Sequence, residues 1–197
     1  MTKKTNHVDK NILRRRLYQY YNSFDAYFSD KNDSLDNIPW LLKCFNLAKT
    51  EFILNVGCGS DGLAIELSSH PDVISVVGMD FSTIAIKRMD QVADQMHVGN
   101  VSFIIGDAEA IPFNDSFFEL VFSKSVLEHL VDPYRSIDEM CRVSRNLVAF
   151  ETANYCSPFL IVGETGVKSG GGNMFTAFKA FFTNLLSLHQ IKRIATS

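Results

Sequence analysis

Short apolar runs alternate with helical patterns through the middle of the chain, and this alternation predicts an α/β fold. Phe52–Val56 has the length and composition of a buried strand. Four later runs share that composition and are separated by polar turns or by apolar residues at helical spacing: Val73–Met79, Val101–Ile105, Phe117–Ser123 and Leu147–Thr152. Strands connected by helices in this way build right-handed βαβ units. We therefore expect a mostly parallel, twisted sheet flanked by helices.

The connections between these strands predict the helices. Apolar residues at helical spacing indicate three helices and one short helical turn: Leu63–Leu67, Thr83–Met96, Tyr134–Ser144 and the turn Val126–Leu130. Ser60 or Asp61 would cap the first helix and Ser82 the second, because their side-chain oxygens can accept the free N–H groups of a helix's first turn.

The two flanks of this core follow different patterns. Residues 1–48 predict an N-terminal helical cap or lid, and residues 49–153 form the expected core. Residues 154–197 predict the rest of the same domain as a long loop, Asn154–Gly172, followed by an apolar, Phe-rich helix, Met174–Leu188.

The composition narrows the class of protein. Hydrophobic residues make up 46% of the chain and charged residues 21%, as in ordinary globular proteins. A net charge of -3 argues against a nucleic-acid partner. The four cysteines form no C-x-x-C pair, and no His stands at ligand spacing, which favours a reduced, cytoplasmic protein without a metal site. No apolar run approaches the ~18 residues of a membrane span.

The loop after the first strand is rich in glycine and carries the first candidate chemistry. Residues 57–62 read Gly-Cys-Gly-Ser-Asp-Gly, and Gly57 and Gly59 let a ligand approach the main chain because they have no Cβ atom. This pattern fits the G-x-G-x-x-G loop of dinucleotide-binding proteins, with Asp80 as its acidic partner. It fits the glycine loop of an S-adenosylmethionine (SAM) site equally well.

Two carboxylates at strand ends extend this candidate site. Asp80 follows the second strand and can accept hydrogen bonds from both ribose hydroxyls of an adenosine ligand, while Asp107 follows the third strand and can accept from the adenine amine. Each aspartate alone could equally be a turn residue or a helix cap. Together with the glycine loop they favour a nucleotide site at the carboxyl ends of the strands.

Three blocks of sequence resemble a known family. Leu54–Gly62 and Val76–Ser82 look like the first two motifs of class I SAM-dependent methyltransferases, and Gly106–Val143 is similar to their subgroup called methyltransferase type 11. The resemblance covers roughly residues 50–152 and implies a Rossmann-like fold, SAM as cofactor and S-adenosylhomocysteine as product.

The resemblance also implies which residues hold the cofactor. They lie in and after the first strand and at the ends of the next three strands: Asn55, Gly57, Cys58, Gly59, Asp80, Phe81, Asp107, Ala108 and Ser123. The glycine loop would line the methionine part. Asp80 would hold the ribose with Phe81 beside the adenine, and Asp107 with Ala108 would read the adenine edge. Ser123 would face the reactive end of the cofactor.

Two positions depart from the family pattern. Asn55 stands where the family usually has an acidic residue, and Asp61 stands where a third glycine is usual. Asp61 either supplies the missing negative charge from a neighbouring position or weakens binding. His129 lies in the expected site region and could act as a general base for an oxygen acceptor, or could be a structural imidazole that fixes its loop.

These observations lead to one functional hypothesis and two alternatives. We expect a SAM-dependent methyltransferase that acts on a small-molecule acceptor by in-line methyl transfer. The first alternative is a catalytically degenerate SAM-binding module, which Asn55 and Asp61 would favour. The second, an NAD-dependent oxidoreductase, leaves Asp107 and its surrounding block unexplained.

The C-terminal part is expected to differ from the family. Seven strands are usual in its sheet, and the pattern after Thr152 contains no clear counterpart of the last two. Either the sequence is truncated or the sheet is closed in another way. An uncovered edge on the fifth strand would invite pairing, so we expect that Met174–Leu188 covers it or that the chain forms a homodimer there.

Overall fold

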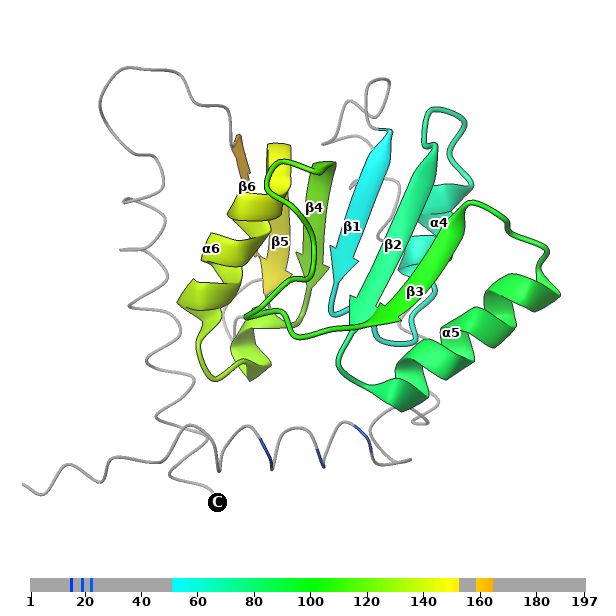
Figure 1. The fold of residues 1–197 in the computed structure, drawn as a ribbon, viewed down its shortest axis with the longest axis horizontal. Coiled ribbons are helices and arrows are strands. Elements are labelled where there is room, and N and C mark those ends of the chain that lie inside the picture. The colour runs from blue at the N-terminus through cyan, green and yellow to red at the C-terminus, as the bar shows by residue number, and fades with distance from the viewer. Residues whose placement is uncertain (1–14, 16–18, 20–21, 23–50, 153–158, 165–197) are drawn as a thin grey trace, which may run out of the picture.

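A computed structural model describes residues 15, 19, 22, 51–152 and 159–164. Its described part contains one six-stranded sheet with the strand order β3-β2-β1-β4-β5-β6 (Figure 1). The strands are β1 (Phe52–Val56), β2 (Ser75–Asp80), β3 (Val101–Ile105), β4 (Phe118–Lys124), β5 (Ser144–Thr152) and β6 (Phe159–Glu164). The first five pair in parallel, whereas β6 runs antiparallel to β5. The expected Rossmann-like fold is therefore confirmed.

Helices cover both faces of this sheet. They are α4 (Leu63–Ser68), α5 (Thr83–Gln95), the short 3-10 helix η3 (Leu127–His129) and α6 (Pro133–Val143). On one face, Ile53 and Phe122 pack with the buried residues of α4 and α5. On the other face, Leu54 and Val121 pack with α6. Side chains alternate between the faces of a strand, so each parallel strand supplies both halves of the core.

The helix starts explain how the chain turns after each strand. Ser82 caps α5 as predicted, since its side chain accepts from the N–H of Ala85. Asp132 caps α6 and is followed by Pro133 in the first helical position, where no N–H is needed. The predicted cap of α4 was wrong: its N-cap is Gly62, in the left-handed conformation with φ 79°. The Asp61 carboxylate still accepts from the N–H of Leu63, at 3.0 Å.

The far edge of the sheet differs from the expectation. The predicted loop Asn154–Gly172 contains β6, which pairs with β5 from Leu147↔Glu164 to Thr152↔Phe159. The edge of β5 is therefore covered by this chain's own backbone. The helix expected over Met174–Leu188 and nearly all of the expected cap over residues 1–48 lie outside the described residues. Because β6 already pairs along this edge of β5, the expectation of a homodimer through that edge is wrong, and a homodimer through another surface stays a prediction.

Candidate functional site

The loop between β1 and α4 turns sharply across the carboxyl end of β1. Gly57, Gly59 and Gly62 all have positive φ angles, of 69°, 52° and 79°. The N–H groups of Gly57 and Cys58 both donate to the carbonyl oxygen of Met79, at 2.7 and 3.0 Å. The loop is therefore fastened to the end of β2, and its backbone follows a path that glycine takes without a Cβ clash.

Asp80 joins the loop to the start of α5. Its Oδ2 accepts from the N–H of Gly59 at 2.9 Å, and its Oδ1 accepts from the N–H of Ser82 at 2.8 Å. The residue is 5% exposed. Burial raises the pKa of this carboxyl, while the backbone N–H groups that it accepts from act in the opposite direction. A carboxylate offers about four acceptor positions, so the backbone bonds from Gly59, Phe81 and Ser82 leave capacity for a hydroxyl donor of a ligand.

The end of β3 lies beside Asp80. The N–H of Gly106 donates to the carbonyl oxygen of Asp80 at 2.9 Å, which places Asp107 directly after this contact. Asp107 is exposed, and its Oδ1 accepts from the N–H of Glu109 at 2.8 Å. Ala108 is half-buried. The predicted adenine-side residues thus lie in the loop directly after β3, the strand next to the one that ends at the predicted ribose-side residue.

The end of β4 reaches the glycine loop from the other side. Ser123 pairs with Val56, the residue before the loop, and is fully buried. Its Oγ has no hydrogen-bond partner among the described residues. Two residues later, Ser125 has a positive φ of 52°, which is uncommon for a residue with a side chain. Val126 follows, and its methyl groups occupy the space where a Cβ on Gly57 would lie.

Cys58 and Asn55 are both buried. The Cys58 side chain is buried in the core between the sheet and α4 and α5. Its burial raises the pKa of the thiol, with the charges of Asp80 and Asp61 acting in the same direction, so the thiol stays neutral. Asn55 is 2% exposed and pairs in register with Gly78 and Phe122. Only the backbone of Cys58 can therefore line a ligand.

His129 closes the short helix η3 after β4. It is half-buried, and its backbone N–H donates to the carbonyl oxygen of Val126 at 2.8 Å. This contact ties the histidine to the residue that covers Gly57. Its role as a base stays a prediction.

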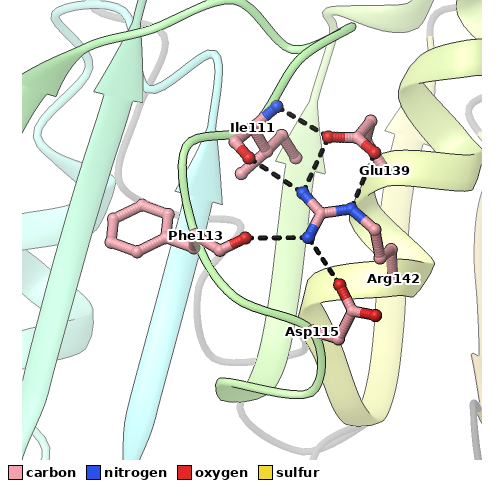
Figure 2. Close-up of polar contacts among 5 residues, drawn as sticks. All are labelled: Ile111, Phe113, Asp115, Glu139 and Arg142. Carbon is pink, nitrogen blue, oxygen red and sulfur yellow. Dashed lines mark hydrogen bonds and ion pairs between the residues drawn. The ribbon is translucent and has the colours of Figure 1, made fainter.

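Arg142 holds the loop that carries Asp107. Figure 2 shows its guanidinium between α6 and the β3–β4 loop. Nε and Nη2 donate to the two carboxylate oxygens of Glu139, each at 2.8 Å, and Nη1 donates to Asp115. Nη1 and Nη2 also donate to the carbonyl oxygens of Phe113 and Ile111, at 2.8 and 2.9 Å. Glu139 completes the network by accepting from the N–H of Ile111.

Sequence reasoning missed three of these supports. Arg142 lies in the Gly106–Val143 block that resembles the family, but the carbonyl groups that it contacts lie about 30 residues earlier, in a loop without a regular pattern. Val126 contacts Gly57 only because β4 lies next to β1. Asn22 accepts at its Oδ1 from both the N–H and the hydroxyl of Thr83, at 3.0 and 3.1 Å. For these three supports, the local sequence contains one signal: Glu139, three positions before Arg142, is at the spacing of an ion pair within a helix.

Comparison with known protein families decides the affiliation. A family model described as a methyltransferase domain matches residues 47–169. The chain belongs to this methyltransferase domain family. The resemblance to class I SAM-dependent methyltransferases is confirmed, and SAM is the cofactor of the family. The matching family model is described as a methyltransferase domain and does not specify the type 11 subgroup, so that subgroup stays a prediction.

Curated relatives share this methyltransferase domain. The ubiquinone/menaquinone biosynthesis C-methyltransferase UbiE of Citrifermentans bemidjiense is 30% identical over 56% of this chain and 48% of its own length. Ajmaline N-methyltransferase of Rauvolfia serpentina is 35% identical over 49% of this chain and 33% of its own. Tocopherol O-methyltransferase of Arabidopsis thaliana is 28% identical over 74% of this chain and 45% of its own length. The chain therefore spans about half or less of the length of these relatives.

Solved structures show the same fold. The YcgJ protein of Bacillus subtilis superposes with a TM-score of 0.57 at 22% identity and covers 61% of this chain and 52% of its own. The PH0226 protein of Pyrococcus horikoshii has a TM-score of 0.54 at 26% identity, and the match covers 68% of this chain and 66% of that protein's chain.

The residues of this methyltransferase domain fit its cofactor. SAM offers ribose hydroxyls and an adenine amine as donors. The site places the carboxylate of Asp80 at the end of β2 and that of Asp107 just after the end of the neighbouring strand β3. The buried Ser123 hydroxyl, without a partner among the described residues, adds a polar group at the end of β4. Among the described residues, there is no group of three His, Cys, Asp or Glu that could hold a metal ion. No helix in the described part of the chain has the length and hydropathy of a membrane span.

Proposed function

We propose that this domain binds SAM along the carboxyl ends of β1 to β4 and transfers a methyl group to a small organic acceptor. The observation that carries the proposal is the connection of the glycine loop to Asp80 through the Gly59 N–H. That bond sets a buried acceptor beside a loop whose backbone a ligand can approach closely, in a chain of the methyltransferase family.

Each residue has a defined task in this proposal. Asp80 accepts from the ribose hydroxyls, and Phe81 lies beside the adenine. Asp107 and Ala108 contact the adenine edge, and the backbone of residues 57–59 lines the methionine part. Ser123 faces the reactive end. The bound cofactor supplies an activated methyl group, so the protein's contribution is orientation and exclusion of water from an in-line attack.

The acceptor is proposed as a class only. The three curated relatives are named as a C-, an N- and an O-methyltransferase. Their names include quinones, an alkaloid and a tocopherol, all small organic molecules. A small-molecule acceptor is therefore the class that this chain's relatives support, and the methylated atom differs among them. His129 is the proposed base if the acceptor atom is oxygen.

Calorimetric titration with SAM, S-adenosylhomocysteine and NAD tests the cofactor assignment. We expect micromolar binding of both adenosyl ligands and no heat of binding from NAD. A catalytic domain then methylates a small organic acceptor in a screen that detects S-adenosylhomocysteine formation. If the protein binds SAM but methylates no quinone, alkaloid or tocopherol acceptor, the result would instead support the degenerate SAM-binding module. Absence of adenosyl-ligand binding would overturn the proposal.

A further inference from the structure

A buried carboxylate that the proposed function does not use links two loops at the carboxyl ends of the strands. Glu109 lies in the loop after β3 and is 4% exposed. Its Oε1 accepts from the backbone N–H of Asp132, at 3.1 Å. Asp132 is the N-cap of α6, so this bond joins the β3–β4 loop to the start of a helix 23 positions later in the sequence.

The backbone of Glu109 belongs to the turn on the adenine side of the proposed site. Its N–H donates to Oδ1 of Asp107 at 2.8 Å, and the N–H of Ala110 donates to the carbonyl oxygen of Asp107 at 2.9 Å. The Glu109 side chain therefore extends from the turn that contains Asp107 to the chain that follows β4.

Residues 125–132, the β4–α6 segment, are fixed at their start as well. The N–H of Ser125 donates to the carbonyl oxygen of Glu151 in β5, at 2.8 Å. At the other end, the N–H of Asp132 donates to the Glu109 carboxylate. The proposed base His129 lies between these two attachments, so its position relative to the site depends on both of them.

Apolar packing also connects the two loops, but it does not fix their relative position. Ile111 and Leu127 are buried in the same core cluster, and Ala108 and Leu130 pack against it. Such packing is non-directional, whereas a hydrogen bond weakens steeply as its angle departs from linearity. A buried carboxylate also has a desolvation cost that its hydrogen bonds must offset. The Glu109 bond is therefore better explained by a role in geometry than by a gain in stability.

We propose that Glu109 is a positioning residue, which sets the β4–α6 segment, and His129 with it, relative to the adenine side of the cofactor site. This inference rests on the proposed function. A ligand that binds Asp107 holds the turn from which the Glu109 side chain extends. It thereby orders the β4–α6 segment through Glu109, which has no assigned contact with the ligand.

Hydrogen exchange with and without S-adenosylhomocysteine tests the inference, because it measures the opening of each segment separately. In the unmodified protein, the ligand should slow exchange about tenfold or more in residues 107–110 and in residues 126–132. In Glu109→Ala, the ligand should still protect residues 107–110. Residues 126–132 of this variant should exchange at rates within about twofold of each other with and without the ligand.

Two conservative variants separate the length of the side chain from its charge. Glu109→Gln keeps the length and an oxygen acceptor for the Asp132 N–H, so it should retain the ligand-dependent protection of the β4–α6 segment. Glu109→Asp keeps the charge but is one methylene shorter, so it should lose that protection as Glu109→Ala does. If circular dichroism shows that Glu109→Ala is unfolded, the comparison of these two variants decides the question.

Glu139→Ala is the matched control, because it removes another carboxylate that attaches the β3–β4 loop to α6. Its Oε2 accepts from the N–H of Ile111, two residues after Glu109, at 2.9 Å. Exchange in the β3–β4 loop should become faster in this variant. S-adenosylhomocysteine should nevertheless protect its β4–α6 segment about as strongly as in the unmodified protein.

The outcomes separate this inference from the proposed function. The role of Glu109 is overturned if the ligand protects the β4–α6 segment equally in Glu109→Asp and the unmodified protein, or does not protect it in the unmodified protein. It is also overturned if Glu139→Ala loses the protection to the same extent. In each of these cases, ligand binding by the unmodified protein still upholds the cofactor assignment. If calorimetric titration detects no binding of S-adenosylhomocysteine to the unmodified protein, the proposed function fails and this inference fails with it.

Discussion

Gly57 and Gly62 share a left-handed backbone but have different surroundings. A Cβ on Gly57 would lie 2.3 Å from a methyl carbon of Val126, whereas a Cβ on Gly62 would meet nothing within 4 Å. We therefore expect Gly62→Ala to lower the free energy of unfolding by about 1 kcal/mol, the cost of the left-handed conformation alone. Gly57→Ala should cost about 2–4 kcal/mol, because overpacking adds to that cost. Urea denaturation of both variants measures the difference.

A double variant identifies the cause of the larger effect. Val126→Ala removes the methyl groups that a Cβ on residue 57 would meet, so it should recover part of the stability lost in Gly57→Ala. Equal costs for the two glycine substitutions would show that the contact between the β1 loop and the end of β4 is looser than described.

Asp80 makes stability depend on pH in a defined direction. Burial raises the pKa of its carboxyl above the ordinary value of 3.8. Between that value and the raised pKa, the folded protein binds more protons than the unfolded chain, so the free energy of unfolding falls as pH rises. The contribution is fully present below pH 3.8 and is lost as pH passes the raised pKa.

A comparison with Asp80→Asn isolates this contribution. The variant has no titrating group at position 80, so other carboxyls, including Glu139 with its lowered pKa, largely cancel in the difference. The free energy of unfolding of the unmodified protein minus that of the variant should fall as pH rises from 3.8 to the raised pKa of Asp80. Above that pKa the difference should become level. A difference that rises with pH would mean that the backbone N–H bonds outweigh burial.

At the scale of elements, one side chain joins α6 to the β3–β4 loop. Arg142 makes five hydrogen bonds to four residues of these two segments: Ile111, Phe113, Asp115 and Glu139. Lys has one compact ammonium group and cannot reproduce the planar, bidentate arrangement. We expect Arg142→Lys to lower the free energy of unfolding by about 1–3 kcal/mol, mainly through the two part-buried carbonyl acceptors. The contact with the exposed Asp115 should add little.

Arg135→Lys is the matched control for this prediction. Arg135 lies in the same helix but is exposed, so its substitution should change the stability by less than about 0.5 kcal/mol. Hydrogen exchange provides the second measurement: amides of residues 106–117 should exchange faster in Arg142→Lys than in Arg135→Lys. Equal exchange in both variants would refute the view that Arg142 holds this loop.

The elements that sequence predicted best are those encoded by local signals. Val101–Ile105 was predicted with its observed bounds, and Ser82 caps α5 as expected, because strand composition and capping need only neighbouring residues. β6 was missed because an edge strand is defined by its pairing with β5 and lies in a segment with turn residues on both sides. The cap of α4 was misassigned because the left-handed Gly62 shifts the helix start past Asp61.

The candidate site divides in the same way. The glycine loop, Asp80 and Asp107 could be found from sequence, since each follows a strand with a recognisable pattern. Their supports come from distant parts of the chain, as the Val126 contact with Gly57 and the Asn22 bonds to Thr83 show. No local pattern encodes such contacts, because they exist only after the strand order brings the segments together.

For the whole molecule, the two ends of the sheet have different chemistry. The carboxyl ends of the parallel strands carry the glycine loop and the aspartates. The amino end of β4 carries an aromatic cluster in which Phe118 meets Phe113 and Phe117 edge to face, at centroid distances of 4.8 and 4.9 Å. Glu119 beside this cluster pairs with Arg145 and accepts from the N–H of Phe52. Stability and ligand binding should therefore respond to different substitutions.

Phe118→Leu tests this separation. Phe118 is 1% exposed and lies five residues before Ser123, about 16 Å along the strand. The variant should lose about 1–2 kcal/mol of stability through lost packing, while its Kd for SAM stays within threefold of the unmodified value. Phe117→Leu, at a residue that is 45% exposed, should cost less than about 0.5 kcal/mol and provides the matched control. A large loss of SAM affinity in folded Phe118→Leu would mean that the aromatic end is coupled through β4 to the binding end, and the two could no longer be treated as independent.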